Sequence, residues 1–321
     1  MNRSLLTKSI LEGRLLLAAC TAVMLVYCWT RVWLVGQFDM SRFEIIIEQF
    51  RDWEQFSPVP FEYLATPTGR ISMAYDDPIL ILCVCLWVIA RGSDCVSGEI
   101  GRGTMEMLLA QPVSRAQVLW SHASVTLAGL ALLALASWVG LYVGIHTNTI
   151  EERVTPTWSI PWLGIEIPRP LAEEQIVRRP MAEKVDAAHL APAAFNLFSL
   201  GFFLAGLSTL LSSMDRYRWR TIGVVVGIYI VQLALKIVGL ASERVAWLGR
   251  VSFFTAYEPT RFVSIAVHQP ESTWSLLLRD AAGEWTSLGP LGYNLILLGM
   301  GAGAYVAATV IFHRRDVPAP L

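Results

Sequence analysis

The five cysteines are the residues whose type most directly suggests chemistry, because soft thiolates bind Cu(I). Cys83 and Cys85 form a C-x-C pair, and the others are Cys20, Cys28 and Cys95. In a helix, residues two apart point about 200° away from each other, so the pair is poorly placed to share a metal. Five cysteines in 321 residues also imply no disulfide framework. We therefore predict that they are small apolar core residues and that the chain holds no metal.

A second constellation would make the chain a protease. Glu173, Glu174 and Arg178 match the E-E-x-x-x-R core of membrane-embedded CAAX-type proteases, whose glutamates sit in a membrane helix with histidines on others. Prolines at positions 168, 170 and 180 flank the motif here, which indicates an outer loop. The five histidines form neither H-x-x-x-N nor H-x-x-x-D. We expect no catalytic residues in this chain.

Hydrolysis of ATP by the chain itself is excluded by its lysines. A P-loop needs Gly-Lys-Ser/Thr, so that the lysine meets the β- and γ-phosphates. The three lysines of the chain follow Thr7, Glu183 and Leu235, and no Gly-Lys pair exists. Any ATP-driven work must therefore come from a partner subunit. The net charge of −1 also provides no basic field for nucleic acid.

The stretch 97–115, SGEIGRGTMEMLLAQPVSR, carries the most informative pattern. It predicts a short helix over 104–111, with Thr104 as N-cap, a sharp turn permitted by Gly103, and a stop at Pro112. Apolar residues spaced i, i+3, i+4 share one face of this helix, namely Met105, Leu108 and Leu109. A short helix with one apolar face, lying beside the membrane, is suited to being gripped by another protein.

Matches to a known motif follow the second predicted membrane span at Glu99, Arg102, Gly103, Thr104, Glu106, Leu108, Leu109, Pro112, Val113, Ser114 and Arg115. This set resembles the signature of ABC-2-type transporter permeases, E-x-x-x-G-T-x-E-x-L-L-x-x-P-x-S-R. The ending FHRRD at 312–316 and the amphipathic residues 1–14 are similar to the family's basic C-terminus and elbow helix. Where the family usually has Gly-Lys, this chain has Ser121 and His122. The nearest group is the multicopper-enzyme-maturation permeases.

The resemblance implies a division of labour. A separate ABC ATPase subunit would bind ATP and Mg, and this chain would bind no cofactor and pair with a second permease as a homodimer or heterodimer. The implied ATPase-coupling residues are Glu99, Arg102, Gly103, Thr104, Met105, Glu106, Leu108, Leu109, Pro112, Ser114 and Arg115. We interpret the apolar members Met105, Leu108 and Leu109 as anchors in the ATPase. The charged members Glu99, Arg102, Glu106 and Arg115 would form the rim.

Composition shows which elements must position this segment. Hydrophobic residues make up 54% of the chain and charged residues 16%, which argues for a membrane protein rather than a soluble enzyme. Six stretches approach the length of about 20 apolar residues that crosses a bilayer: 15–35, 79–98, 118–145, 190–211, 221–240 and 291–312. The second has only 12 purely apolar residues, so it must continue through Arg91 and Asp94, which are spaced to pair on one helical face. We predict an all-α polytopic fold with one domain over 1–321.

Charge distribution predicts the orientation of these spans. Segments 1–14, 91–117, 212–220 and 313–321 hold 11 basic and 6 acidic residues, whereas loops 36–78, 146–189 and 241–290 hold 12 basic and 20 acidic residues over a longer length. The positive-inside rule therefore places both termini in the cytoplasm and the long loops outside the plasma (inner) membrane. Residues 1–14 suit an interfacial elbow helix, and loop 146–189 suits an irregular or partly β cap.

Three smaller features leave alternatives open. The G-x-x-x-G pairs Gly223/Gly227 and Gly299/Gly303 suit close helix packing, although glycine is common in membrane spans. Arg31 and Lys236 suit snorkelling to the interface, or a counter-charge for substrate. The stretch 247–268 suits either a membrane re-entrant segment or amphipathic surface packing.

Two functional hypotheses follow. In the first, the chain is the permease of an ABC exporter, working by alternating access or by a mechanical pull on an external partner. In the second, it is a non-transport scaffold or anchor whose outer loops bind a partner protein. The substrate is not indicated by the sequence.

Overall fold

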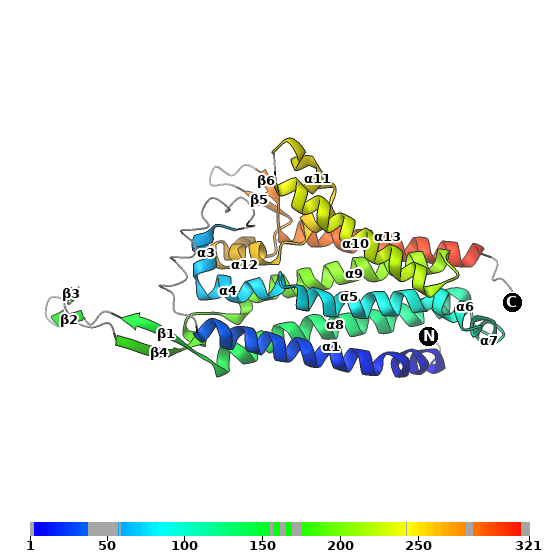
Figure 1. The fold of residues 1–321 in the computed structure, drawn as a ribbon, viewed down its shortest axis with the longest axis horizontal. Coiled ribbons are helices and arrows are strands. Elements are labelled where there is room, and N and C mark those ends of the chain that lie inside the picture. The colour runs from blue at the N-terminus through cyan, green and yellow to red at the C-terminus, as the bar shows by residue number, and fades with distance from the viewer. Residues whose placement is uncertain are drawn as a thin grey trace.

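Six long helices form an elongated bundle, with the two chain ends at the same end of the molecule (Figure 1). The computed structural model describes residues 3–37, 57, 59–154, 157–160, 165–168, 175–241, 243–279 and 285–315. Its membrane-length helical segments are α1 (Arg3–Gln37), Pro67–Gly101, α8 (Arg115–Thr147), Ala187–Met214, α10 (Arg218–Ala241) and α13 (Pro290–Arg314). Each contains one of the six predicted stretches, and the predicted all-α polytopic fold is confirmed.

The second membrane segment is built from several short elements. It comprises α4 (Pro67–Ser72), η2 (Met73–Tyr75), α5 (Pro78–Ser93), the π-helical turn η3 (Asp94–Gly98) and α6 (Glu99–Gly101). The prediction that it continues through Arg91 and Asp94 is confirmed. The prediction that these two pair with each other is wrong, because each bonds to residues of other elements. The isolated helix α7 (Met105–Leu109) then follows.

The predicted separate elbow helix of residues 1–14 is not a separate element in the structure. From Arg3 onward these residues form one helix with the first span, α1. The reason is that no proline interrupts the sequence and a lone glycine, Gly13, does not break a long helix. Its buried face here begins at Leu5 and Ser9, which lie against the bundle rather than in an interfacial plane.

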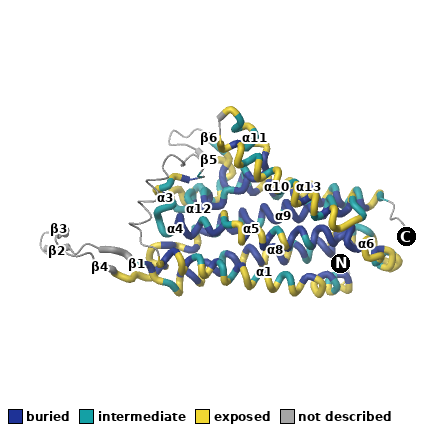
Figure 2. The backbone as a smooth tube through the Cα atoms, in the orientation of Figure 1, coloured by how far each residue is buried: buried dark blue, intermediate teal, exposed yellow. Residues whose placement is uncertain are grey.

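Helix α9 (Ala191–Met214) lies at the centre of the bundle and packs against α5, α8, α10, α12 and α13 (Figures 1 and 2). Its closest approach is to α13, where a Cβ on Gly206 would meet the carbonyl oxygen of Gly301 at 2.5 Å. The predicted close packing at the two G-x-x-x-G pairs is not found among the described residues, because none of them places an atom from another element within 4 Å of a Cβ built on any of those four glycines. The glycine between the second pair makes the contact instead.

Away from the chain ends, the described residues form short helices and three antiparallel strand pairs. The strands are β1 (Thr149–Val154) with β4 (Gln175–Pro180), β2 (Thr157–Ile160) with β3 (Ile165–Pro168), and β5 (Leu277–Arg279) with β6 (Trp285–Leu288). The helices are α3 (Phe61–Ala65), η4 (Met181–Glu183), η5 (Ala187–Leu190), η6 (Glu243–Val245), α11 (Ala246–Val251), η7 (Phe253–Ala256), α12 (Pro259–His268) and η8 (Pro270–Ser272). The first two strand pairs form an arm that extends beyond the helices (Figure 1).

The two basic residues inside predicted spans are held by the protein. Arg31 lies 3.6 Å from Asp77 at the start of α5. Lys236 donates to the carbonyl oxygens of Phe254 and Tyr257 at 2.9 and 3.1 Å. Lys236 therefore links the end of α10 to the residues that follow α11. The stretch 247–268 packs through α12 against α9 and α4.

Candidate functional site

The segment that carries the permease-like motif forms a sharp turn and a short helix at the end of the bundle where the termini lie (Figure 1). Gly103 has φ 71°, the left-handed conformation that glycine adopts without steric cost, so the predicted turn is confirmed. Thr104 occupies the N-cap position of α7, but its hydroxyl donates to the carboxylate of Glu99 instead of capping the helix. The helix ends at Leu109, two residues earlier than predicted.

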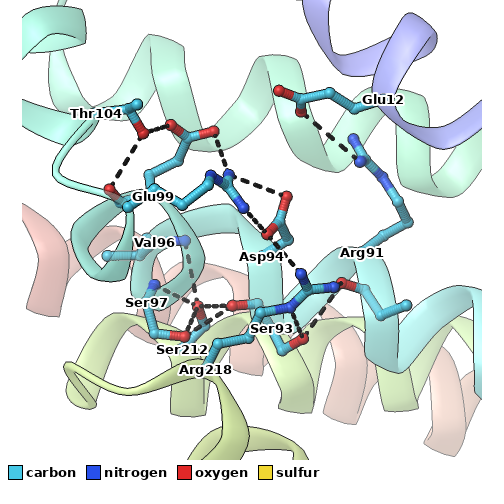
Figure 3. Close-up of polar contacts among 12 residues, drawn as sticks. Glu12, Arg91, Ser93, Asp94, Val96, Ser97, Glu99, Thr104, Ser212 and Arg218 are labelled. Atoms are coloured by element: carbon cyan, nitrogen blue, oxygen red, sulfur yellow. Dashed lines mark hydrogen bonds and ion pairs between the residues drawn. The ribbon is translucent and has the colours of Figure 1, made fainter.

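Glu99 is the first of two buried carboxylates that organise this turn (Figure 3). It is 4% exposed and accepts hydrogen bonds from Lys8 Nζ at 2.8 and 3.0 Å and from Arg102 Nη2 at 2.9 Å. A buried charge is stable only when it is paired and hydrogen-bonded. The predicted role of Glu99 at the rim of a partner interface is therefore wrong: its carboxylate is already enclosed by α1 and by its own turn.

Asp94 is the second buried carboxylate, 5% exposed. It accepts from Arg102 at 2.6 and 3.3 Å and lies 3.2 Å from Arg218 Nη1 (Figure 3). The hydrogen bond to Asp94 raises the pKa of Arg102 above its ordinary value. Arg102 thus bridges both carboxylates, while Arg218 brings in the first turn of α10.

A second group of ion pairs ties α5 to α1. Arg91 lies 4.0 Å from Glu12 (Figure 3). It also donates to the carbonyl oxygen and hydroxyl of Ser9. Lys8 lies 3.7 Å from Glu12 as well as bonding Glu99. The start of the first span, the end of the second and the start of the fifth are therefore joined by one charge network, which comprises Lys8, Glu12, Arg91, Asp94, Glu99, Arg102 and Arg218.

Three carboxylates of this network, Glu12, Asp94 and Glu99, have oxygen atoms within 4.8 Å of one another, a spacing that suits a cation. Four basic side chains already neutralise them: Lys8, Arg91, Arg102 and Arg218. Their positive charge exceeds the negative charge of the three carboxylates. Ion pairing is therefore the chemistry that this arrangement supports best.

A serine from α9 fixes the π-helical turn in place. Ser212 accepts hydrogen bonds from the backbone N–H groups of Val96 and Ser97 at 3.2 and 2.9 Å, and its hydroxyl donates to the carbonyl of Ser93 at 2.9 Å (Figure 3). A π-turn shifts the helical hydrogen-bond pattern, and such turns are frequent at functional sites. The serine hydroxyl supplies bonds to backbone groups of this turn from a neighbouring helix.

The apolar face predicted to grip a partner faces the protein itself. Met105 is 1% exposed and belongs to the core, and Leu109 packs against that core. Leu108 is half-buried beside α1. The periodicity correctly grouped these residues on one face, but the anchoring role predicted for Met105 is wrong because a partner has no access to it. The exposed side of the segment consists of Glu106, Met107, Ala110, Gln111 and Pro112.

The last two motif residues begin α8 and hold the end of α13. Ser114 forms a capping box with Gln117, which explains why a serine precedes the helix. Arg115 donates to the carbonyl oxygen of Phe312 at 3.0 Å and stacks on its ring at 5.8 Å. Arg115 is therefore a contact between spans, and its predicted place at the rim of an ATPase interface stays a prediction.

The described residues give no support to the two sites that the sequence disfavoured, the protease motif and a cysteine metal site. Arg178 pairs with Glu151 across β1 and β4 at 2.8 Å, while Glu173 and Glu174 lie outside the described residues. All five cysteines are free thiols, and the buried ones belong to the hydrophobic core. Sequence reasoning missed five members of the charge network: Lys8, Glu12, Arg91, Asp94 and Arg218. The one available signal was the presence of Arg91 and Asp94 in an otherwise apolar span.

Comparison with known families gives a match over nearly the whole chain. Residues 14–317 match the family described as ABC-2 family transporter protein. The matched range includes the motif-bearing turn and all but the first turns of α1 and the last residues of the chain. No curated protein matches the chain.

Proposed function

The chain belongs to the ABC-2 family of transporter proteins, and we propose that it is a permease subunit driven by a separate ATPase that docks on α7 and residues 110–112. One observation carries this proposal. The side of this segment that faces away from the bundle is exposed, while its opposite side is joined by buried ion pairs to the ends of several spans. Such an element transfers an external load into the membrane helices.

Met107 is the best candidate for the anchor, because it is 71% exposed at the tip of the segment. An unbranched thioether side chain adapts to an irregular pocket, and anchors in pockets carry most interface energy. Glu106 and Gln111 flank it and supply a polar rim.

The route of the load follows the contacts of the network. Movement of α7 displaces Arg102, which carries Asp94 and Glu99 with it. Glu99 passes the displacement to α1 through Lys8, and Asp94 passes it to α10 through Arg218. Both routes are short and pass through the buried carboxylates of Glu99 and Asp94, so they transmit a displacement with little loss.

The remaining parts of the proposal come from the family, apart from the orientation in the membrane, which rests on the distribution of basic residues in the sequence. ATP and Mg are bound by the partner ATPase, two permeases pair, both termini are cytoplasmic in the plasma (inner) membrane, and substrate is exported or an external partner is pulled. The rival hypothesis, a scaffold that binds a partner outside, is favoured by one feature, the β1–β4 arm that projects beyond the helices (Figure 1).

Replacement of Met107 by Asp tests the proposal. A candidate ABC ATPase subunit is co-expressed with the permease, and its recovery in a pull-down is measured against the membrane level of the permease. Burying an unpaired charge at the centre of the interface should release the ATPase. Met214→Asp is the matched control, because Met214 is also an exposed methionine, 58%, at the end of α9 and next to Asp215, whose carbonyl accepts from Arg315 after α13. Normal membrane levels with undiminished ATPase recovery for Met107→Asp would refute docking on α7.

A further inference from the structure

An apolar groove with a volume of about 800 Å³ lies between α1 and α8. Nine of its lining residues come from α1 and five from α8, and the indole of Trp87 from α5 also lines it. The hydroxyls of Thr21 and Ser124 in its walls donate to carbonyl oxygens of their own helices, at 2.7 Å each. The groove therefore offers an apolar surface with few free polar groups.

Local packing explains why the two helices part here. Toward the outer end they touch closely, since a Cβ on Gly140 would lie 2.8 Å from Cys28 Cβ. Toward the end that holds the termini, the Trp87 ring lies between Gly13 and Gly129, where added Cβ atoms would approach it to 3.0 and 2.3 Å. The indole holds the helices apart and its N–H is satisfied by the Thr126 carbonyl at 2.8 Å.

The part of the groove between Arg14 and Leu25 matches one leaflet of a bilayer in length. The apolar stretch 15–35 of α1 is centred on Leu25, and Arg14 immediately precedes it. Both residues line the groove, and the eleven helical steps from Arg14 to Leu25 rise about 16 Å. Half of a hydrocarbon core of about 30 Å is about 15 Å. Arg14 thus lies at headgroup level when Leu25 lies at the bilayer midplane.

The charge of Arg14 selects the occupant of the groove. Arg14 is exposed and forms no ion pair with any described residue. Arg3 lies eleven residues earlier, about 20° away on the same helical face. An apolar groove that crosses one leaflet, with a cation at headgroup level, is complementary to one acyl chain and the phosphate of an anionic phospholipid.

We propose that the α1–α8 groove binds an anionic glycerophospholipid from the leaflet on the side of the termini, with its acyl chain against Trp87 and Ala128 and its phosphate on Arg14. This site is independent of the transport function proposed above, because it requires only that the chain spans a membrane. This site differs from the lipid layer that surrounds any membrane protein in two ways. It selects for an anionic headgroup, and the base of the groove is formed by Trp87 of a third helix, α5.

Native mass spectrometry of the full-length chain, titrated with dioleoyl phosphatidylglycerol or dioleoyl phosphatidylcholine, tests the proposal. The wild-type chain should bind phosphatidylglycerol in preference to phosphatidylcholine. Arg14→Gln should weaken phosphatidylglycerol binding about fivefold, the usual contribution of one basic residue at an anionic membrane surface. Ala128→Phe should abolish the tightest binding of both lipids by filling the groove.

Two matched controls should leave lipid binding unchanged. Arg314→Gln removes an exposed arginine at the far end of α13, and Leu135→Phe enlarges a residue on the same face of α8 two turns beyond Ala128. Equal phosphatidylglycerol binding by wild type and Arg14→Gln would overturn the proposal even if Ala128→Phe failed to fold. A change in oligomeric mass for Ala128→Phe without a change in bound lipid would identify the groove as a protein interface and also overturn it.

Discussion

The charge network makes a quantitative prediction about Asp94. Its two partners, Arg102 and Arg218, have side chains 42% and 43% exposed, whereas the Asp94 side chain is 8% exposed. Replacing one arginine by Gln leaves the other bonded to the carboxylate. That loss falls in the range of exposed ion pairs, up to about 1 kcal/mol. Replacing both leaves a buried charge without a partner, which costs about 3–5 kcal/mol.

A rescue variant separates this effect from simple loss of contacts. Adding Asp94→Asn to the double variant removes the buried charge, so most of the lost free energy of unfolding should return even though a third native residue has been changed. Thermal unfolding of the purified chain in detergent, followed by intrinsic tryptophan fluorescence, measures all four proteins. Additive single losses, or a triple variant less stable than the double, would show that the buried charge is not what these arginines stabilise.

Three further predictions concern backbone positions, each measured by thermal unfolding in detergent. Gly129→Ala places a Cβ 2.3 Å from the Trp87 ring and should cost about 1–3 kcal/mol, whereas Gly223→Ala meets no atom within 4 Å and should have no effect; equal effects would contradict the packing. Gly103→Ala forces an L-residue to a φ of 71° and should cost about 1–2 kcal/mol, while Gly103→Asn should cost less. Ser212→Ala removes the acceptor for two N–H groups of η3 and should cost about 1–3 kcal/mol; unchanged hydrogen exchange of those amides would contradict this.

The sequence predicted the spans well because crossing a bilayer requires long apolar stretches, a property of local composition alone. The turn at Gly103 was also predictable, because a left-handed backbone conformation is favoured by glycine itself. The helix start at Thr104 was predicted correctly, although the Thr104 hydroxyl bonds to Glu99 instead of capping the helix. The direction in which that helix faces could not be predicted. A period of 3.6 groups Met105 with Leu108 but carries no information about which neighbour covers them, and the core of the same chain covers Met105.

The expected ion pair between Arg91 and Asp94 is not formed, for a related reason. Spacing of three residues permits Arg91 and Asp94 to pair, but such local pairs are weak, about 0.2–0.5 kcal/mol, and are replaced when tertiary partners come closer. Here Asp94 bonds Arg218, 124 positions away in the chain, at 3.2 Å. Partners so distant in sequence become visible only once the fold is known.

The fifth span, α10, shows why the network suits a moving assembly. Three of its described residues are buried, Thr221, Val225 and Gly239, so interior packing holds it weakly along its length. Polar contacts hold its two ends instead: Arg218 to Asp94 at one end, and Lys236 to the carbonyl of Phe254 near the other. A helix that is held mainly at its ends and packed lightly along its length tilts when one end is displaced, because few buried side chains have to repack. Because the displaced end is the one joined to the turn that bears α7, α10 is the span that a docked partner would move most easily.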